Sequence, residues 1–194
     1  KNLKDAIGEY DATAVRMHGR FMVQGPEHQK DRITEALKRV FGIVSVSPVI
    51  EVELDLEDLK YSVDNSIKTF RCSSFKIASR RANKEFPFTS PELNRILGDH
   101  VLKIRPDLKV DLDHPDITLS IEIGYDKAYL YSESFSGPGG LPLGITGKAL
   151  LLLSGGIDSP VAGWLAMKRG LNIEALHFHS FPFTGKKSQE KTAE

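Results

Sequence analysis

The chain has 194 residues, of which 40% are hydrophobic and 27% charged, and its formal net charge is zero at pH 7. This composition is ordinary for a globular protein and predicts one to three domains that each bury a core. No stretch reaches the roughly 18 apolar residues that a membrane span needs, and the lone Cys72 excludes an internal disulfide, so we expect a cytoplasmic protein with no membrane partner.

Residues 1–47 carry the element order α-β-β-α-β. The predicted elements are a short helix over 1–7, strands over 12–17 and 20–24, a helix whose apolar face runs over 33–41, and a strand-rich run over 43–49. Gly42 stands where the C-cap of the second helix belongs. This order is typical of a ferredoxin-like domain without its first strand. Because the chain starts at Lys1 rather than at Met, we expect its first residues to be missing.

Residues 48–135 are predicted to form a mixed α/β domain. We expect a helix over 56–70 with Asp55 as its N-cap, and a second helix with Ser90 as N-cap and Pro91 at the first helical position. Alternating apolar and polar residues predict the strands, which run over 74–80, 108–112, 117–123 and 128–131.

The charges of this domain are separated along the chain. Residues 71–105 hold eight Lys or Arg against three Asp or Glu, whereas residues 106–140 hold two against seven. A basic block of this kind is typical of a docking face for an anion, since evenly mixed charges would indicate a passive solvated surface.

The basic block also supplies candidate nucleic-acid contacts, because cations bind phosphates and aromatic rings stack on exposed bases. The candidates are Lys76, Arg80, Arg81, Lys84 and Phe86. The same residues also fit a solvated basic face with phenylalanines in the core beneath it.

Residues 136–147 are rich in glycine and proline and predict an interdomain linker. They are not expected to bind phosphate, because the segment precedes a strand instead of following one.

The residues from 148 to 194 predict the start of a parallel-sheet domain. The expected elements are a strand over 149–153, a helix over 160–169 with Val161, Ala162 and Leu165 facing inward, and a strand over 173–178. The apolar first strand is typical of a strand buried on both faces. A two-stranded unit of this kind is not expected to be stable alone, so we expect the rest of the domain to be missing.

The motif Ser154-Gly155-Gly156-Ile157-Asp158-Ser159 joins that first strand to the helix. Glycine lets the backbone approach an anion closely and tolerates positive φ. The start of the helix offers free N–H groups and the positive end of the helix dipole, and the two serines can add hydroxyl donors. Asp158 would repel a phosphate unless a cation lay between them, so the motif predicts a Mg²⁺-bound triphosphate or a role for Asp158 in orienting the loop.

This motif resembles the phosphate loop (PP-loop) of ATP pyrophosphatases, which cleave ATP between the α- and β-phosphates. Upstream, Phe75-Lys76-Ile77 followed by Arg80-Arg81, Lys84 and Phe86-Pro87 is similar to a THUMP domain, an RNA-binding module. The order of ferredoxin-like domain, THUMP domain, glycine-rich linker and PP-loop resembles the tRNA 4-thiouridine synthetase family of tRNA sulfurtransferases, which also serves thiamine biosynthesis.

The resemblance implies an enzyme that adenylates uridine 8 of tRNA and replaces AMP by persulfide sulfur, with Asp158 as the catalytic residue. It implies ATP and Mg²⁺ as cofactors and tRNA and a cysteine desulfurase as partners, and it allows a homodimer. The implied ATP contacts are Leu152, Leu153, Ser154, Gly155, Gly156, Ile157, Asp158, Ser159, His177 and Phe178.

Two other functions stay open from the sequence. One is an RNA-binding module with a non-catalytic nucleotide fold, and the other is an adenylating synthetase of another PP-loop branch that acts on a small acid. His177 and His179 share one face of the last strand, but two ligands without Cys or acidic partners make a poor metal site, so we expect no protein-bound metal. Cys72 is expected to be a structural thiol rather than a sulfur carrier.

Overall fold

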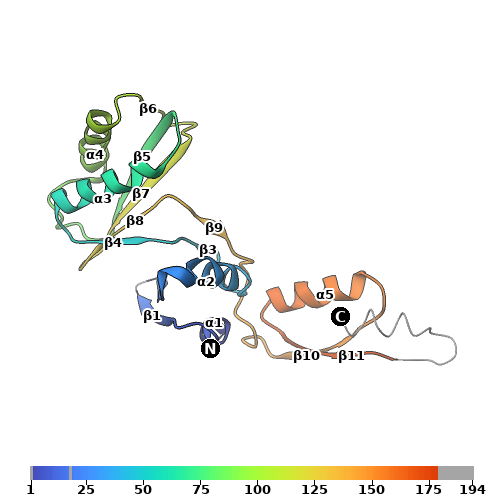
Figure 1. The fold of residues 1–194 in the computed structure, drawn as a ribbon. Coiled ribbons are helices and arrows are strands. Elements are labelled where there is room, and N and C mark those ends of the chain that lie inside the picture. The colour runs from blue at the N-terminus through green and yellow to red at the C-terminus, as the bar shows by residue number, and fades with distance from the viewer. Residues whose placement is uncertain (1, 18, 179–194) are drawn as a thin grey trace. The chain divides into compact units, whose positions relative to one another are not determined.

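The computed structural model describes residues 2–17 and 19–178 (Figure 1). Its contacts divide the chain into two compact units, one formed by Lys1–Val46 with Phe135–Glu194 and the other by Ser47–Ser134. Both units combine helices with strands, which is the α/β class that the sequence predicts.

The amino-terminal part of the first unit is a β hairpin packed against short helices. The elements are α1 (Asn2–Ile7), β1 (Thr13–Met17), β2 (Arg20–Gln24), the 3-10 helix η1 (Glu27–Gln29) and α2 (Lys30–Leu37). Strands β1 and β2 pair antiparallel, with Val15 opposite Met22. Ile7, Ile33 and Leu37 form the buried core of this part.

Helix α2 and the residues after it differ from the prediction. The helix ends at Leu37 and gives way to turns in which Val40 N–H donates to Leu37 O at 3.1 Å. The strand-rich run over 43–49 proves to be β3 (Ser45–Val46), which ends before Pro48, a residue without an N–H to donate. Strand β3 pairs with β9 (Phe135–Ser136), a strand that no sequence pattern indicated.

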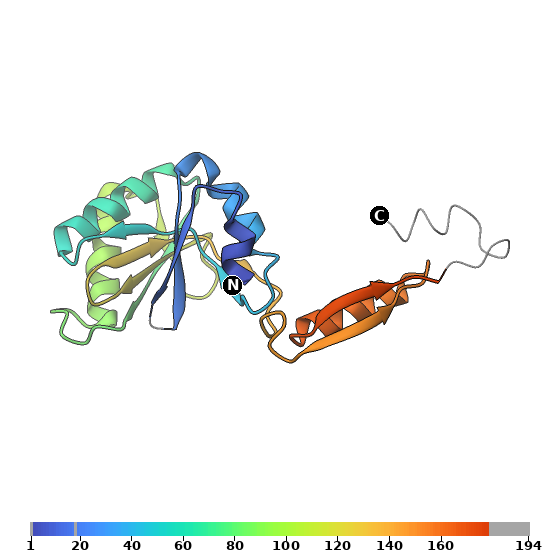
Figure 2. The same cartoon turned by 90° about the horizontal axis from the view of Figure 1, so that it is seen from below.

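The second unit is one five-stranded sheet with two helices on one face (Figure 2). The elements are β4 (Ile50–Val52), α3 (Leu56–Thr69), β5 (Ser74–Arg81), α4 (Ser90–Ile104), β6 (Lys109–Val110), β7 (Ile117–Ile123) and β8 (Ala128–Tyr131). The strand order is β4-β8-β7-β5-β6; β5 pairs parallel with both β6 and β7, and the other pairs of this sheet are antiparallel. The helices bury Leu59, Leu93 and Leu97 against Phe75 and Leu119 of the sheet.

Helices α3 and α4 each begin at a residue whose side chain caps the first turn. Asp55 caps α3 as predicted, because its carboxylate accepts hydrogen bonds from Glu57 N–H at 2.8 Å and Asp58 N–H at 3.3 Å. The cap of α4 is Thr89 and not Ser90, since only Thr89 lies three residues before Glu92, the spacing that a capping box requires. The hydrogen bonds from Thr89 lower the pKa of Glu92 below its usual value.

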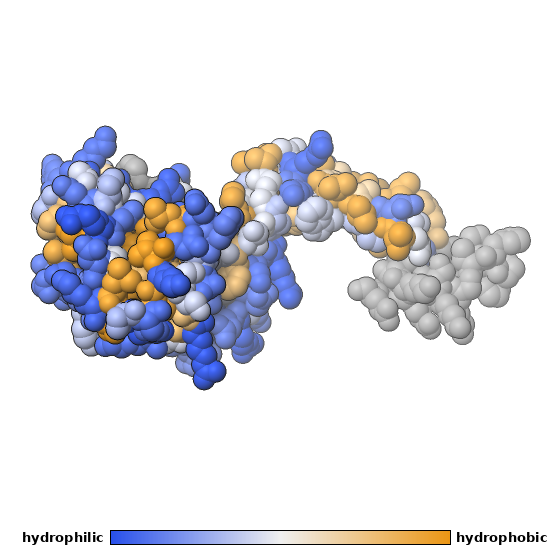
Figure 3. Space-filling model, turned by 90° about the horizontal axis from the view of Figure 1, so that it is seen from above, coloured by the Kyte–Doolittle hydropathy of each residue, from blue (hydrophilic) through white to orange (hydrophobic). Residues whose placement is uncertain are grey.

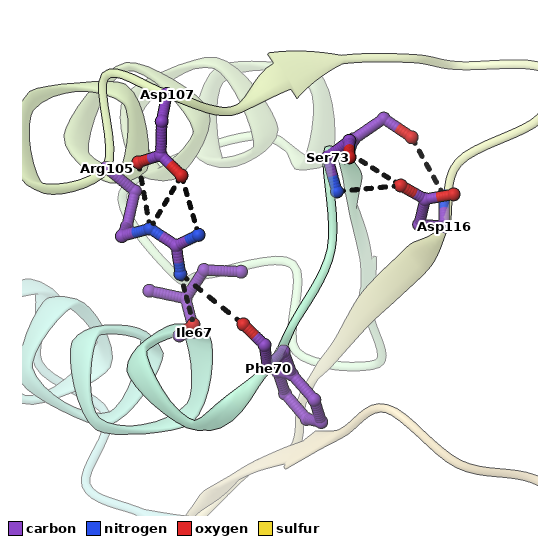
Figure 4. A network of polar contacts seen from close by, with 7 residues as sticks. Ile67, Phe70, Ser73, Arg105, Asp107 and Asp116 are labelled. Atoms are coloured by element: carbon purple, nitrogen blue, oxygen red, sulfur yellow. Dashed lines mark hydrogen bonds and ion pairs between the residues drawn. The ribbon is translucent and has the colours of Figure 1, made fainter.

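Two carboxylates tie neighbouring segments of the second unit together (Figure 4). Asp116, just before β7, accepts from Ser73 N–H at 2.8 Å and Ser74 N–H at 2.9 Å, and these bonds lower its pKa. Asp107 pairs with Arg105 at 2.7 Å, and the guanidinium lowers the pKa of this carboxyl. Arg105 Nη1 also donates to Ile67 O at 3.3 Å, so the end of α3 is fixed to the end of α4.

The carboxyl-terminal part of the first unit is a βαβ arrangement. Strand β10 (Lys148–Leu152) pairs parallel with β11 (Asn172–Leu176), and α5 (Asp158–Lys168) connects them. The helix turns Gly163 toward the sheet, where a Cβ would lie 2.8 Å from Leu151 Cδ2.

The prediction that Val161, Ala162 and Leu165 face inward is wrong, because all three are exposed while Gly163 is buried. Leu150 and Leu152 are also 61% and 60% exposed, so β10 is not buried on both faces. Figure 3 shows apolar surface, in orange, on this part of the chain. The sequence pattern identified the strand and the helix correctly but not the face that is covered.

The predicted linker is held by backbone hydrogen bonds. Gly139 N–H donates to Ile43 O at 2.8 Å, and Leu141 N–H donates to Lys168 O at 2.9 Å. Gly140, between them, has φ 76°, and a Cβ there would lie 2.1 Å from Lys168 O. The segment therefore follows one defined path between its neighbours.

Candidate nucleotide-binding loop and basic surface

The loop between β10 and α5 brings its two serines together. Ser154 N–H donates to Ser159 Oγ at 2.9 Å, and the two hydroxyl oxygens lie 3.0 Å apart. Gly156 N–H donates to Ser154 Oγ at 3.3 Å. These bonds close the loop into a short arc at the start of α5, with its backbone exposed to solvent.

The start of α5 keeps the features that favour an anion. The N-cap Ile157 makes no side-chain hydrogen bond to the first turn. Within the described residues no side-chain cap therefore occupies the N–H groups of Asp158 and Ser159, and Pro160 has no N–H. Ile157 is 83% exposed. Gly155 and Gly156 are not among the glycines with positive φ in the described residues, so close backbone approach, rather than left-handed conformation, is what glycine offers here.

Asp158 is the first residue of α5 and is exposed. Within the described part of the chain it has no hydrogen-bond or ion-pair partner, and no group of three or more His, Cys, Asp or Glu side chains is arranged for a metal ion. A Mg²⁺ ion at Asp158 would therefore take its other ligands from phosphate oxygens and water, which matches the way that Mg²⁺ usually binds.

Strand β11 ends beside the loop. Leu153 N–H donates to Leu176 O at 2.8 Å, and His177 Nδ1 lies 2.8 Å from Leu153 O. His177 Nε2 is buried and has no hydrogen-bond partner among the described residues. Phe178 is 70% exposed. The structure thus brings Leu152, Leu153 and His177 to the same sheet edge as the serines, while His179 lies outside the described residues.

The candidate RNA contacts do not form one surface. Along β5, Lys76 and Arg80 project from the sheet face opposite the one that buries Phe75 and Ile77. Arg80 and Lys84 are exposed, whereas Lys76 Nζ donates to Leu112 O at 2.7 Å. The freest cations of the predicted set are therefore Arg80 and Lys84.

Phe86 is a correction to the predicted RNA contacts. Its ring is only 7% exposed and belongs to the core of the second unit, with the ring of Phe88 6.1 Å away in an edge-on arrangement. Arg81 Nη1 donates to Phe86 O at 3.1 Å, which uses part of the Arg81 side chain to hold this turn. A buried ring cannot stack on a base, so the core reading of Phe86 is the one that the structure supports.

A groove beside α4 includes one residue that the sequence analysis missed. It has a volume of about 490 Å³ and is lined by Lys76, Ile77, Arg95, Gly98 and Leu112, among others. Arg95 is 73% exposed and lies 3.8 Å from Asp99, one turn further along the helix. The helical spacing of Arg95 and Asp99 was readable, but only the fold places Arg95 beside Lys76.

The environment of Cys72 does not favour a reactive thiolate. Burial raises the pKa of the Cys72 thiol, and the side chain packs against the core of the second unit.

Among the described residues, no helix combines the length and the hydrophobicity needed to cross a lipid bilayer.

Three family profiles match successive parts of the chain. The ThiI ferredoxin-like domain matches residues 1–47, the THUMP domain matches 53–133, and the thiamine biosynthesis protein (ThiI) profile matches 144–194. A probable tRNA sulfurtransferase of Moorella thermoacetica is 52% identical over 83% of this chain, and one of Natranaerobius thermophilus is 47% identical over 97%. These alignments cover 41% and 47% of the relatives, so the chain spans about half the length of the curated proteins it matches.

Two solved structures share the fold. The crystal structure of a 4-thiouridine synthetase–RNA complex with bound ATP has a TM-score of 0.81 and 36% identity, covering 97% of this chain and 50% of that one. A crystal structure of a Pyrococcus horikoshii protein has a TM-score of 0.84 and 31% identity, covering 98% of this chain and 64% of that one. The profiles, the relatives and the fold agree along the sequence, and the chain belongs to the ThiI family, whose curated members are named tRNA sulfurtransferases.

Proposed function

We propose that the full-length protein carrying this chain is an ATP-dependent tRNA sulfurtransferase that makes 4-thiouridine. The observation that carries the proposal is the closed Ser154–Ser159 loop at a helix start whose first N–H groups have no side-chain acceptor. A related structure contains both RNA and ATP, which supports ATP at this loop and tRNA as the substrate.

The loop residues would bind the phosphates of ATP. Backbone N–H groups at the start of α5 and the hydroxyls of Ser154 and Ser159 would donate to phosphate oxygens. Asp158 would hold Mg²⁺ against those oxygens, which offsets the repulsion between its carboxylate and the phosphates. Neutralising the charge that develops on the departing pyrophosphate is the catalytic benefit of this arrangement.

The remaining steps follow from the family. Uridine 8 of tRNA would be adenylated at O4 with release of pyrophosphate. The terminal sulfur of a cysteine persulfide would then displace AMP, and a second thiol would cleave the S–S bond, which leaves 4-thiouridine and a disulfide. A cysteine desulfurase as sulfur donor, a second role in thiamine thiazole synthesis, a homodimeric assembly and a cytoplasmic location complete the proposal. Cys72, which is partly buried in the second unit, is not proposed as the sulfur carrier.

Asp158→Asn in the full-length protein tests the proposal. Tight tRNA binding should be unchanged, while tRNA-dependent pyrophosphate release should fall by about a hundredfold or more, because a charged ligand to Mg²⁺ is lost. Asp126→Asn, at an exposed carboxylate of the second unit, is the matched control and should leave both unchanged.

The outcomes separate the candidate functions. Normal pyrophosphate release by Asp158→Asn would show that the catalytic role is wrong. If the unaltered protein binds tRNA and ATP but releases no pyrophosphate, it is an RNA-binding module with a non-catalytic nucleotide fold. If a small acid rather than tRNA stimulates release, the protein belongs to another adenylating branch.

A further inference from the structure

The carboxyl-terminal end of α5 closes with a turn at Gly170. This glycine has φ 89°, and its N–H donates to Met167 O at 2.8 Å. Leu171 N–H donates to Ala166 O at 3.2 Å. The turn therefore satisfies two of the carbonyls that a helix leaves free at this end, and a left-handed glycine is the usual residue for it.

The next two carbonyls accept hydrogen bonds from the predicted linker. Leu141 N–H donates to Lys168 O at 2.9 Å, and Thr146 Oγ1 donates to Arg169 O at 3.0 Å. Donors are favourable here because they face the negative end of the helix dipole. The linker is thus bonded to the backbone at the end of the helix that begins with the phosphate loop.

An aromatic contact joins the same helix to the residues before β3. The rings of Phe41 and Trp164 lie 5.6 Å apart in an edge-on arrangement, at 61°. Beside them Gly42 N–H donates to Gly139 O at 2.8 Å, and Gly139 N–H donates to Ile43 O at 2.8 Å. The residues before β3, the linker and α5 are therefore held together. The α5 anchor is defined as Phe41, Leu141, Thr146 and Trp164.

The second unit is inserted into the chain between the segments that form the anchor. The chain leaves the first unit after β3 and returns to it at β9, and these strands pair antiparallel, with Val46 opposite Phe135. Phe41 precedes β3, and the linker residues of the anchor follow β9. A rearrangement of the second unit that moves β3 or β9 therefore acts on the anchor through both covalent connections.

The opposite end of α5 presents the phosphate loop. The helix has 11 residues, with Asp158 as the first, and is about 16 Å long. Near its middle Gly163 lies so close to β10 that a Cβ would be 2.8 Å from Leu151 Cδ2. A helix moves as a rigid element. With a close contact at its middle, a shift of its carboxyl-terminal end also moves the N–H groups at its start.

We propose that Phe41, Thr146 and Trp164 are positioning residues that couple tRNA binding by the second unit to ATP binding at the phosphate loop. The inference rests on the proposed function, which supplies both ligands. Coupling is reciprocal, so tRNA should raise the affinity for ATP by the same factor as ATP raises the affinity for tRNA. The benefit is that the phosphates are placed for cleavage only when the substrate is bound.

The test uses α,β-methylene-ATP with Mg²⁺, an analogue that cannot be cleaved between its α- and β-phosphates. Its affinity for the full-length protein is measured by equilibrium titration with and without saturating tRNA. In the unaltered protein tRNA should raise this affinity about fivefold or more. In Thr146→Ala and in Trp164→Leu the factor should fall to about twofold or less, with tRNA affinity unchanged in the absence of nucleotide. Thr146→Ser, which keeps the hydroxyl donor, should retain the full factor.

Thr69→Ala is the matched control. Thr69 Oγ1 donates to Ser66 O at 2.7 Å near the end of α3, so this variant also removes an exposed threonine hydroxyl bonded to a helix carbonyl, but in the second unit. It should retain the full coupling factor. Phe41→Leu and Trp164→Leu remove the same ring contact, so the double variant should lose no more coupling than either single variant.

Each outcome decides the question. A coupling factor that survives in either Thr146→Ala or Trp164→Leu would overturn the proposal, because tRNA and nucleotide would then affect each other without the anchor. Equal affinity of the unaltered protein with and without tRNA would overturn it too, as would an equal loss in Thr69→Ala. Failure of the unaltered protein to bind the analogue or tRNA at all would instead contradict the proposed function, so the two failures are distinguishable.

Discussion

Phe86 and its neighbours show how one short segment contains both packing and surface residues. The ring of Phe86 is buried in the core of the second unit, while Lys84, two residues earlier, is exposed. The Arg81 guanidinium donates a hydrogen bond to the Phe86 carbonyl oxygen, so part of this cation stabilises the turn. An aromatic residue inside a basic stretch is therefore not by itself a nucleic-acid contact.

Substitution of Phe86 separates packing from RNA binding. Phe86→Ala should destabilise the protein by about 3–5 kcal/mol, because it removes a buried ring and leaves a cavity. Phe86→Leu should keep most of the stability and the whole of the tRNA affinity. Urea unfolding and filter binding on both variants check this, and a folded Phe86→Leu protein with weakened tRNA binding would restore Phe86 as a contact.

At the scale of elements, the predicted caps locate the starts of α3 and α4 to within one residue. Asp55 was readable as a cap because an acidic residue precedes the apolar periodicity of α3 directly. At α4, adjacent Thr89 and Ser90 both suit the position, and only the distance to Glu92 separates them. The sequence therefore predicted both helices, but it placed the second cap one residue too late.

The two serine/threonine positions give a direct test of that cap. Thr89→Ala should cost about 1 kcal/mol, the usual loss when an N-cap side chain is removed. Ser90→Ala should change the stability by less than about 0.5 kcal/mol, as for an ordinary first-turn residue. Thermal unfolding of both variants measures the difference, and equal losses would mean that the capping box is shared.

Elements that depend on distant partners could not be predicted. Strands β3 and β9 have two residues each and lie about ninety positions apart, so neither contains a periodic pattern. The covered face of α5 was also missed, because the apolar residues Val161 and Leu165 are exposed while Gly163 meets the sheet. At the candidate site, the motif gave the loop and the resemblance gave His177, but the bond from His177 to Leu153 required coordinates.

The carboxylate contacts of the second unit predict its acid response. Asp116 and Asp107 have pKa values lowered in the folded state by hydrogen bonds from Ser73 and Ser74 and from Arg105. A lowered folded pKa contributes stability that is present above the unfolded pKa, about 3.9, and is lost as the pH falls through the folded value. The urea midpoint should therefore hold from neutral pH to about pH 5 and fall below pH 4.

Removal of one carboxylate should make the urea midpoint depend less on pH in the acid range. Asp116→Asn should lower the urea midpoint at neutral pH and reduce its fall in acid, since one of the linked protonations is gone. Asp126→Asn, which alters an exposed carboxylate without a recorded partner in the described chain, serves as the comparison. An unchanged acid slope in Asp116→Asn would show that other carboxylates set the acid response.

At the scale of the whole molecule, opposite charges are separated along the chain but not in space, because β5 of the basic segment pairs with β7 of the acidic segment and Arg80 lies opposite Glu122. The net charge is zero, yet residues 71–105 are strongly basic and residues 106–140 strongly acidic. A polyanion such as tRNA would therefore be attracted to individual exposed cations, such as Arg80 and Lys84, rather than to a whole basic segment.

Salt dependence measures this effect. Arg80→Ala and Lys84→Ala should each weaken tRNA binding and reduce the slope of log affinity against log salt by about one. Lys109→Ala removes an exposed lysine from the acidic segment and should leave the slope unchanged. If all three variants change the slope equally, tRNA binding depends only on the net charge of the molecule.

The path of residues 137–147 has a consequence for sequence change. Segments that join domains ordinarily accept insertions and replacements, because they run through solvent. At Gly140 two independent obstacles act together, the left-handed backbone and the Lys168 carbonyl within 2.1 Å of any Cβ. A glycine-rich stretch that looks like the most permissive part of this protein should therefore be among its least replaceable, and splices or insertions between its neighbours should fail there first.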